Sequence, residues 1–362
     1  MTGRHESSGE TRRRRVGLAC NDHVRRQYVD DADLARLEPF ADFSHRSFSV
    51  APPRHEATPR DPGAEAELLE FAADLDVLVI CHGAPFVGAG VLAGAPGLTL
   101  LGELEGDRFG HRLDLAAAHE RGIRVVDMSH GSSWPSAEWA LGLALVGRRN
   151  AGAAFRRMIA HEPTFLPAEE RSGPGYEAAE LSHKRIGMIG FGHIARRLVE
   201  LLRPFHVDVR VFDPYCPREL AETYGVVFGP LDKVLESDVV FVLVPLTSTT
   251  KGMIGAAELA HLRPGSVFVN VSRGKVVDAD ALLARLQRGD VIGCLDVFDP
   301  EPLPPDSPLV ELPNVFVTPH IAGVTEESRR RFFALMVDEC LRHFEGFEPL
   351  YELTPEIVRQ RA

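Results

Sequence analysis

The 362-residue sequence has no apolar run long enough to cross a membrane, because a spanning helix needs about 20 apolar residues. We also predict no secretory leader. The start is polar, and Arg12–Arg15 precede only a short apolar run, whereas a leader needs a longer one and a small-residue cleavage site. We therefore predict a cytoplasmic protein whose residues 1–14 form a flexible basic tail.

Cysteine and positive charge are both scarce. The five cysteines are odd in number and widely spaced, without the CxxC pairs or Cys/His clusters of a metal site. This pattern favours a reducing compartment and argues against a bound metal. The 40 Lys and Arg face 52 Asp and Glu, for a net charge of −12. This balance argues against a nucleic-acid surface, which needs a concentrated basic face. It is compatible with a small anionic substrate, because a pocket can be locally positive.

What the sequence does contain is a series of short apolar runs between helical patterns. Runs of four to six apolar residues without alternation are typical of strands buried on both faces, and strands that alternate with helices imply a parallel sheet. We predict strands at Val16–Cys20, Val77–Cys81, Leu98–Leu101 and Ile123–Val126, with helices at Ala64–Ala73 and Leu113–Arg121. A helix over residues 135–149, an irregular stretch over 150–183, a stronger β/α series from Arg185 to Thr318 and a last helix over Thr325–Phe344 follow.

A glycine-rich turn opens the second series. Gly190-x-Gly192-x-x-Ala195 follows the apolar run Ile186–Ile189 and begins a helix that ends near Arg203. The first glycine permits the tight turn, the second lets the backbone approach a pyrophosphate, and a small third residue lets helix and strand pack closely. The anion would sit on the helix N-terminus. This arrangement predicts dinucleotide binding.

Asp213 ends the next predicted strand, 23 positions after Gly190. A carboxylate there accepts hydrogen bonds from the ribose hydroxyls of NAD and repels the 2′-phosphate of NADP. The alternative is a surface turn residue before Pro214. Arg196 and Arg197 are compatible with solvent-facing helix positions or with NADP. We predict NAD as the cofactor.

Three further side chains each follow a predicted strand of the same series: Arg273, Glu301 and His320. Taken singly, they fit a solvated turn arginine, a surface glutamate and a structural histidine. Together they lie at the sheet edge where α/β folds bind ligands. Arginine offers a planar fork of donors for a carboxylate, histidine exchanges protons near neutral pH, and a carboxylate can orient the imidazole. This set is suited to hydride-transfer chemistry with general acid–base help.

Residues 136–320 contain the motifs Ser136-Ala-Glu138, Gly187-Met-Ile-Gly-Phe-Gly-His-Ile-Ala195, Asp213-Pro-Tyr215, Pro245-Leu-Thr247, Asn270-Val-Ser-Arg-Gly274, Leu295-Asp-Val-Phe298, Glu301-Pro302 and Pro319-His320. In these motifs the sequence resembles the D-2-hydroxyacid dehydrogenase family. The resemblance implies that Arg273, Glu301 and His320 are the catalytic residues, that Asp296 holds the nicotinamide carboxamide, and that Pro245 lies along the adenine pocket. By the same resemblance the cofactor-binding residues are Gly190, Gly192, His193, Ile194, Asp213, Pro245, Thr250, Val271, Ser272, Asp296 and Gly323.

The N-terminal region is similar to the family's substrate domain, but less closely. Residues 114–126 match well, whereas the preceding loop, residues 106–112, lacks the usual Gly-x-Gly-x-Asp spacing. The sequence therefore does not identify which 2-hydroxy acid is the substrate. Candidate substrate-binding residues, besides Arg273, are His82, Gly83, Arg108 and Trp134. Arg108 suits a dianionic substrate or is a solvated loop residue. Trp134 lines the pocket or packs against the long helix.

The resemblance implies two doubly wound α/β domains, with a Rossmann NAD domain (131–320) inserted in a flavodoxin-like substrate domain (1–130 plus 321–362). Reaction would occur in the cleft between them, and the segment 135–183 would form a homodimer contact. We expect interconversion of a small D-2-hydroxy acid and its 2-oxo acid. The alternatives are a phosphonate- or phosphite-type dehydrogenase and an NAD-sensing corepressor. A formate-type enzyme would carry glutamine in place of Glu301.

Overall fold

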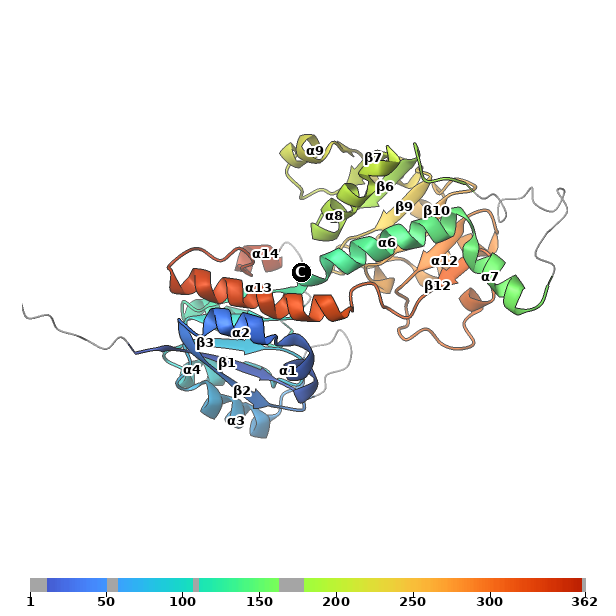
Figure 1. Cartoon of the computed structure of the whole chain (residues 1–362). Helices are drawn as coiled ribbons and strands as arrows, with labels where there is room; N and C mark the ends of the chain where they lie inside the picture. Colours follow the sequence, from blue (N-terminus) through green and yellow to red (C-terminus); the bar gives the residue numbers. More distant parts are fainter. Residues whose placement is uncertain (1–11, 51–57, 107–110, 163–178, 360–362) are drawn as a thin grey trace, which may run out of the picture. The chain divides into compact units, whose positions relative to one another are not determined.

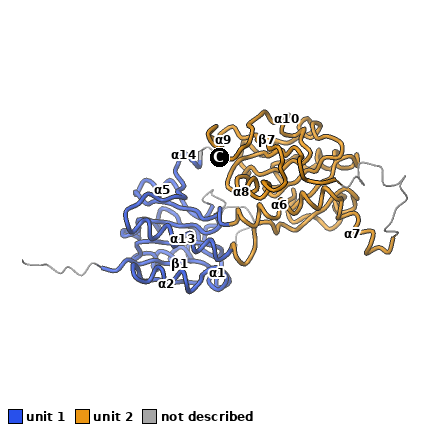
Figure 2. The backbone as a smooth tube through the Cα atoms, turned by 45° about the horizontal axis from the view of Figure 1, so that its top comes forward, with its two compact units in different colours: residues 1–131, 329–360 blue, residues 132–328, 361–362 orange. Residues whose placement is uncertain are grey.

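The computed structural model describes residues 12–50, 58–106, 111–162 and 179–359. The chain forms two compact units (Figure 2). Unit 1 comprises residues 1–131 and 329–360, and unit 2 comprises residues 132–328 with 361–362. The long helix α13 (Glu326–Phe344) therefore belongs almost wholly to unit 1, although it follows unit 2 in the sequence.

Unit 1 is built on a parallel five-stranded sheet in the order β2-β1-β3-β4-β5. Its strands are β1 (Arg14–Cys20), β2 (Ala41–Ser47), β3 (Val77–Ile80), β4 (Leu100–Glu103) and β5 (Arg124–Asp127). This is the flavodoxin-like strand order. Apolar side chains of α1 (Asp22–Tyr28), α2 (Asp31–Leu37) and α13 pack in one core cluster. The second cluster contains α3 (Pro62–Ala72), α4 (Ala89–Gly94) and α5 (Leu115–Glu120), and α14 (Pro355–Arg359) ends the described chain.

Unit 2 is built on a parallel seven-stranded sheet in the order β12-β11-β10-β9-β6-β7-β8. Relabelled from its own first strand, this is the Rossmann order with one extra strand. The strands are β6 (Arg185–Ile189), β7 (Asp208–Phe212), β8 (Val227–Phe228), β9 (Val239–Val242), β10 (Val267–Asn270), β11 (Ile292–Leu295) and β12 (Val315–Val317). The two sheets confirm the predicted α/β class of two doubly wound domains.

The helices of unit 2 cover its sheet, and Figure 1 shows α6 running along it. They are α6 (Ser133–Arg148), α7 (Ala151–Ile159), α8 (His193–Leu202), α9 (Glu219–Tyr224), α10 (Leu231–Leu235), α11 (Ala256–Leu259) and α12 (Ala279–Gln287). Small side chains of α6, Ala137, Ala140 and Ala144, are fully buried against the sheet. Small residues let the helix approach closely, which explains its alanine-rich inner face.

Two sequence predictions need correction. Residues 12–14 are not part of a flexible tail, because Arg12 pairs with Asp76 at 3.1 Å and Arg14 begins β1. The stretch 150–183 is not irregular throughout, because α7 forms over Ala151–Ile159, whose alanines, arginines and methionine favour helix. Asn150, in the left-handed conformation (φ 42°), separates α7 from α6. Among the described residues, no helix combines the length and the apolar character that a membrane crossing requires.

Candidate active site

The glycine-rich turn after β6 has the shape that a dinucleotide needs. Gly190 adopts φ +95°, and a Cβ there would lie 2.9 Å from the backbone of Leu243, so only glycine fits. Gly192 is the N-cap of α8, and a Cβ added to it would meet nothing within 4 Å. His193 and Ile194 begin α8. The open space at this helix N-terminus suits a pyrophosphate.

Asp213 follows β7 directly beside this turn. Its Oδ2 accepts a hydrogen bond from the backbone N–H of Phe191 at 2.8 Å, and its Oδ1 accepts from Tyr215 and Cys216 at 2.9 and 3.0 Å. Burial raises the pKa of the Cys216 thiol, and the Asp213 charge adds to the effect. An ionised carboxylate accepts about four hydrogen bonds. Asp213 therefore keeps capacity for a ribose hydroxyl while it is locked to the glycine-rich turn.

A threonine-rich turn follows β9 and carries the exposed Pro245. The Thr250 hydroxyl donates to the Pro245 carbonyl at 2.5 Å and accepts from the Thr247 N–H at 2.8 Å. Thr250 therefore closes the turn that presents Pro245. The two predicted cofactor residues form one local structure.

The turn that carries Arg273 is organised by Asn270 at the end of β10. The Asn270 side chain is 1% exposed. Its oxygen accepts from the Ser272 N–H and hydroxyl at 3.0 and 3.1 Å, and its amide donates to the Arg273 carbonyl at 3.2 Å. The Arg273 guanidinium donates to the Ser272 carbonyl at 2.7 Å. Val271 and Ser272, both predicted cofactor residues, are buried in this turn.

Gly274 brings this turn against the loop that leaves β11. A Cβ at Gly274 would lie 1.8 Å from the carbonyl oxygen of Phe298 and 2.7 Å from the nitrogen of Asp299. Any side chain here would displace backbone. The Arg273 turn is therefore packed directly on the segment that leads to Glu301.

His320 and Glu301 are in contact, as predicted for an acid–base pair. His320 Nδ1 lies 2.5 Å from Glu301 Oε1, with the side chains 21% and 13% exposed. An ionised carboxylate only accepts hydrogen bonds, so Nδ1 carries the hydrogen. Proton exchange with a ligand then falls to Nε2. The pair comes from loops after β11 and β12, at the carboxyl edge of the sheet.

Asp296 holds the backbone on both sides of His320. His320 has φ +54°, a left-handed conformation that is uncommon for a residue other than glycine. Its N–H donates to the Asp296 carbonyl at 2.9 Å. The Asp296 carboxylate, fully buried, accepts from the Thr318 hydroxyl at 2.6 Å and from the N–H groups of Ile321 and Ala322 at 3.0 and 2.9 Å. One acceptor position of Oδ2 remains for the nicotinamide carboxamide that the resemblance assigns to it.

The loop after β12 also packs on α6. The Trp139 indole donates to the Thr318 hydroxyl at 3.3 Å, and a Cβ at Gly323 would lie 3.3 Å from Ser136 Oγ. Trp134, half-buried at the start of α6, has the Arg197 guanidinium 6.0 Å from its ring centre. Asn270 and Thr318 were not singled out from the sequence. A polar residue at the end of an otherwise apolar strand was the available signal for Asn270.

In unit 1, His82 and Gly83 follow β3 at the carboxyl edge of that sheet. Gly83 adopts φ +95°, and a Cβ there would lie 2.5 Å from the Phe48 carbonyl. Both ring nitrogens of His82 are engaged, Nε2 with Glu105 at 2.6 Å and Nδ1 with Arg112 at 2.8 Å. Sequence reasoning missed Glu105 and Arg112. Arg108 lies outside the described residues.

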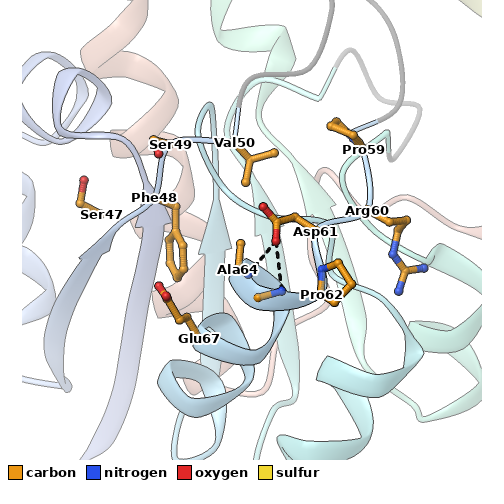
Figure 3. Close-up of a pocket in the computed structure, with 11 residues that line it drawn as sticks. Ser47, Phe48, Ser49, Val50, Pro59, Arg60, Asp61, Pro62, Ala64 and Glu67 are labelled. Carbon is orange, nitrogen blue, oxygen red and sulfur yellow. Dashed lines mark hydrogen bonds between the residues drawn. The ribbon is translucent and has the colours of Figure 1, made fainter.

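Unit 1 also has a pocket beside the start of α3 (Figure 3). It is lined by residues on both sides of positions 51–57, which lie outside the described residues. The helix N-terminus in it is already capped, because the Asp61 carboxylate accepts from the N–H groups of Gly63 and Ala64 at 3.0 and 3.1 Å. None of the predicted site residues lines this pocket.

Comparison with known proteins agrees with this geometry. Residues 141–322 match the family described as "D-isomer specific 2-hydroxyacid dehydrogenase, NAD binding domain". The chain is 33% identical to a D-3-phosphoglycerate dehydrogenase of Methanocaldococcus jannaschii, over 77% of this chain but only 52% of that protein. It is 30% identical to a glyoxylate reductase of Korarchaeum cryptofilum, over 83% of this chain and 89% of that protein.

Solved structures share the fold. The apo D-mandelate dehydrogenase of Rhodotorula graminis superimposes with a TM-score of 0.78 at 24% identity, over 94% of this chain and 97% of that one. The residues that match the family model, 141–322, include the glycine-rich turn, Asp213, the Arg273 turn and the His320–Glu301 pair. The cofactor of this chain is NAD. The chain belongs to the D-isomer specific 2-hydroxyacid dehydrogenase family.

Proposed function

We propose that this chain interconverts a small D-2-hydroxy acid and its 2-oxo acid, with NAD(H) as the hydride carrier. The observation that carries the proposal is the His320 Nδ1–Glu301 Oε1 contact of 2.5 Å at the carboxyl edge of a Rossmann-ordered sheet. A partly buried carboxylate behind an imidazole orients the ring and stabilises the imidazolium that forms during proton transfer. A structural histidine would not need this partner at the carboxyl edge of a sheet that also carries a dinucleotide turn.

The residues divide the chemistry between them. Bound NADH supplies the hydride to the carbonyl carbon of the 2-oxo acid. Arg273, with its planar fork of donors, binds the substrate carboxylate and polarises the carbonyl. Protonated His320 gives its Nε2 proton to the developing alkoxide, and in the reverse direction the neutral ring removes the hydroxyl proton. Glu301 keeps Nδ1–H in place in both directions.

The remaining proposed residues bind the cofactor or the substrate, and each unit has its own role. Unit 2 is the NAD domain, in which Gly190, Gly192, His193 and Ile194 receive the pyrophosphate, and Asp213 the adenosine ribose. Pro245 and Thr250 would border the adenine, and Val271, Ser272, Asp296 and Gly323 the nicotinamide side. Unit 1 is the substrate domain. His82, Gly83, Arg108 and Trp134 remain proposed substrate contacts.

NADH oxidation with a panel of 2-oxo acids tests the activity. His320→Gln should lower turnover by about 10²- to 10⁴-fold, the usual size of general acid–base effects, with NADH affinity unchanged. His261→Gln, an exposed histidine in the same unit, is the matched control. Tight NADH binding without turnover of any 2-oxo acid would favour an NAD-sensing corepressor. Turnover of phosphite or a phosphonate alone would favour that branch of the family.

We also propose a homodimer assembled through α7 in the cytoplasm. Phe155, Met158 and Ile159 are each at least 60% exposed on this helix, and exposed apolar groups of this size mark interaction surfaces. Phe155→Asp should shift the protein from dimer to monomer in light scattering after size exclusion. Val227→Asp, at an equally exposed site on β8, should leave the assembly unchanged. A wild-type monomer would refute the dimer.

A further inference from the structure

A network of four side chains lies at the carboxyl edge of the unit 1 sheet. Tyr28 ends α1, which follows β1. His82 stands two residues after β3, and Glu105 two residues after β4. Carboxyl ends of parallel strands meet at one edge, and that edge is where open α/β sheets bind ligands. The fourth member, Arg112, lies buried beneath them.

The hydrogen bonds determine which atoms carry protons. Arginine only donates, so His82 Nδ1 accepts from the Arg112 guanidinium at 2.8 Å. His82 is therefore neutral, and its single N–H, on Nε2, donates to Glu105 Oε2 at 2.6 Å. Neither ring nitrogen has a hydrogen to offer an anionic ligand. His82 thus positions Glu105 and is not itself an anion-binding group.

Tyr28 holds the other oxygen of the same carboxylate. Its hydroxyl lies 2.6 Å from Glu105 Oε1, and burial, followed by the nearby Glu105 charge, raises the pKa of Tyr28. The phenol therefore keeps its proton and donates it. Each Glu105 oxygen has one partner here and a second acceptor position left. The Glu105 side chain is 25% exposed, so a ligand can reach it.

The charges around Glu105 do not favour a second anion. The Arg112 guanidinium is paired with the fully buried Glu103 at 2.7 Å. Glu103 and Asp127 both approach Gly106, where an added Cβ would lie 2.2 and 2.4 Å from their carboxylate oxygens. Arg329 of α13 is a further cation that acts on Tyr28. Among the described residues around Glu105, these three carboxylates against two guanidinium groups leave no excess of positive charge.

We propose that Glu105 binds a hydrogen-bond donor on the part of the substrate beyond C2. The chain would then act on 2-oxo and 2-hydroxy acids whose side chain ends in a hydroxyl or a protonated nitrogen, and it would discriminate against those that end in a carboxylate or a phosphate. Glu105 is a specificity-determining residue, and His82 and Tyr28 are positioning residues for it. This inference rests on the proposed function.

The test compares substrates that differ only at their far end. NADH oxidation is measured with 2-oxobutanoate, 4-hydroxy-2-oxobutanoate and 2-oxobutanedioate, and with 2-oxohexanoate, 5-guanidino-2-oxopentanoate and 2-oxohexanedioate. In at least one set the donor-ended acid should exceed the methyl- and carboxylate-ended acids by at least about 10-fold in kcat/KM, the lower end for a hydrogen bond to a charged group. The two sets distinguish a hydroxyl from a protonated nitrogen.

Glu105→Gln should remove this preference. The kcat/KM for the favoured donor-ended acid should fall by about 10- to 100-fold, whereas the carboxylate-ended acid should be used no worse than by wild type, because its repulsion is removed. NADH affinity should not change. Glu120→Gln, an exposed glutamate of α5 in the same unit, is the matched control. Should Glu105→Gln fail to fold, Glu105→Asp keeps the charge, shortens the reach and should selectively impair the donor-ended acids.

The outcomes separate the two proposals. If wild type reduces no 2-oxo acid, the proposed function fails. If wild type reduces 2-oxo acids but prefers the carboxylate-ended ones, or if the Glu105 variants change all substrates alike, the dehydrogenase stands and the role of Glu105 is overturned.

Discussion

The contact between Gly274 and the backbone of Phe298 yields a sharp prediction, because one methyl group is enough to break it. In Gly274→Ala the new Cβ would lie 1.8 Å from the Phe298 carbonyl oxygen, whereas ordinary contact begins near 3.4 Å. Both atoms belong to or adjoin backbone, so no side-chain rotation relieves the overlap. One of the two loops must move by about 1.6 Å, the difference between these distances.

This displacement separates Arg273 from the loop that carries Glu301. A misplacement of about 1 Å in an active site can lower the rate by about 10²-fold, and overpacking costs about 1–3 kcal/mol of stability. We therefore expect Gly274→Ala to lose about 10²-fold in kcat and to unfold at lower urea concentration. The measurements are steady-state NADH oxidation and urea unfolding followed by circular dichroism.

Gly229→Ala is the matched control. Gly229 lies in the same unit, and a Cβ added there would meet nothing within 4 Å. It should behave as wild type in both assays. If Gly274→Ala also has wild-type turnover and stability, the two loops are not packed as described, and the reasoning from their contact is refuted.

Three further perturbations follow from single contacts. Asp296→Asn places an amide hydrogen against a donor of Thr318, Ile321 or Ala322, so kcat should fall and the free energy of unfolding should decrease by about 1–3 kcal/mol. An unchanged kcat would contradict the proposal that Asp296 positions His320. Asp213→Ala should weaken NADH binding and reduce the preference for NADH over NADPH, both measured by fluorescence titration. An unchanged ratio of the two affinities would show that Asp213 does not recognise the cofactor. Burial raises the pKa of Glu339 above its ordinary value of 4.5, so the folded state holds this proton more tightly than the unfolded state does. The contribution of the proton to the free energy of unfolding is lost as pH rises from 4.5 through the raised pKa. Between pH 4.5 and the raised pKa, Glu339→Gln should make the urea midpoint less dependent on pH. An unaltered slope of the midpoint against pH would contradict the effect of burial on Glu339.

Edge and surface elements were hard to predict from the sequence. The strand β2 has the polar sequence Ala41-Asp-Phe-Ser-His-Arg-Ser47 and lies at a sheet edge, half exposed. It has no continuous apolar run, so no strand was predicted there. The helix α7 was also missed, although its alanines, arginines and methionine favour helix, because the residues that follow it are rich in Pro, Gly and Glu.

His320 and Glu301 were identified through the resemblance to the family, whereas the two parallel sheets and the dinucleotide turn could be predicted from the residues themselves. These features are encoded by local patterns: apolar runs that must be buried on both faces, and glycines at positions where a Cβ has no room. Which side chains meet across the chain became clear from the folded structure. Asp296 finds its donors 22 to 26 residues away, and Glu105 finds Tyr28 77 residues away. Such partners depend on how separate strands and loops pack, and no spacing in the sequence records that.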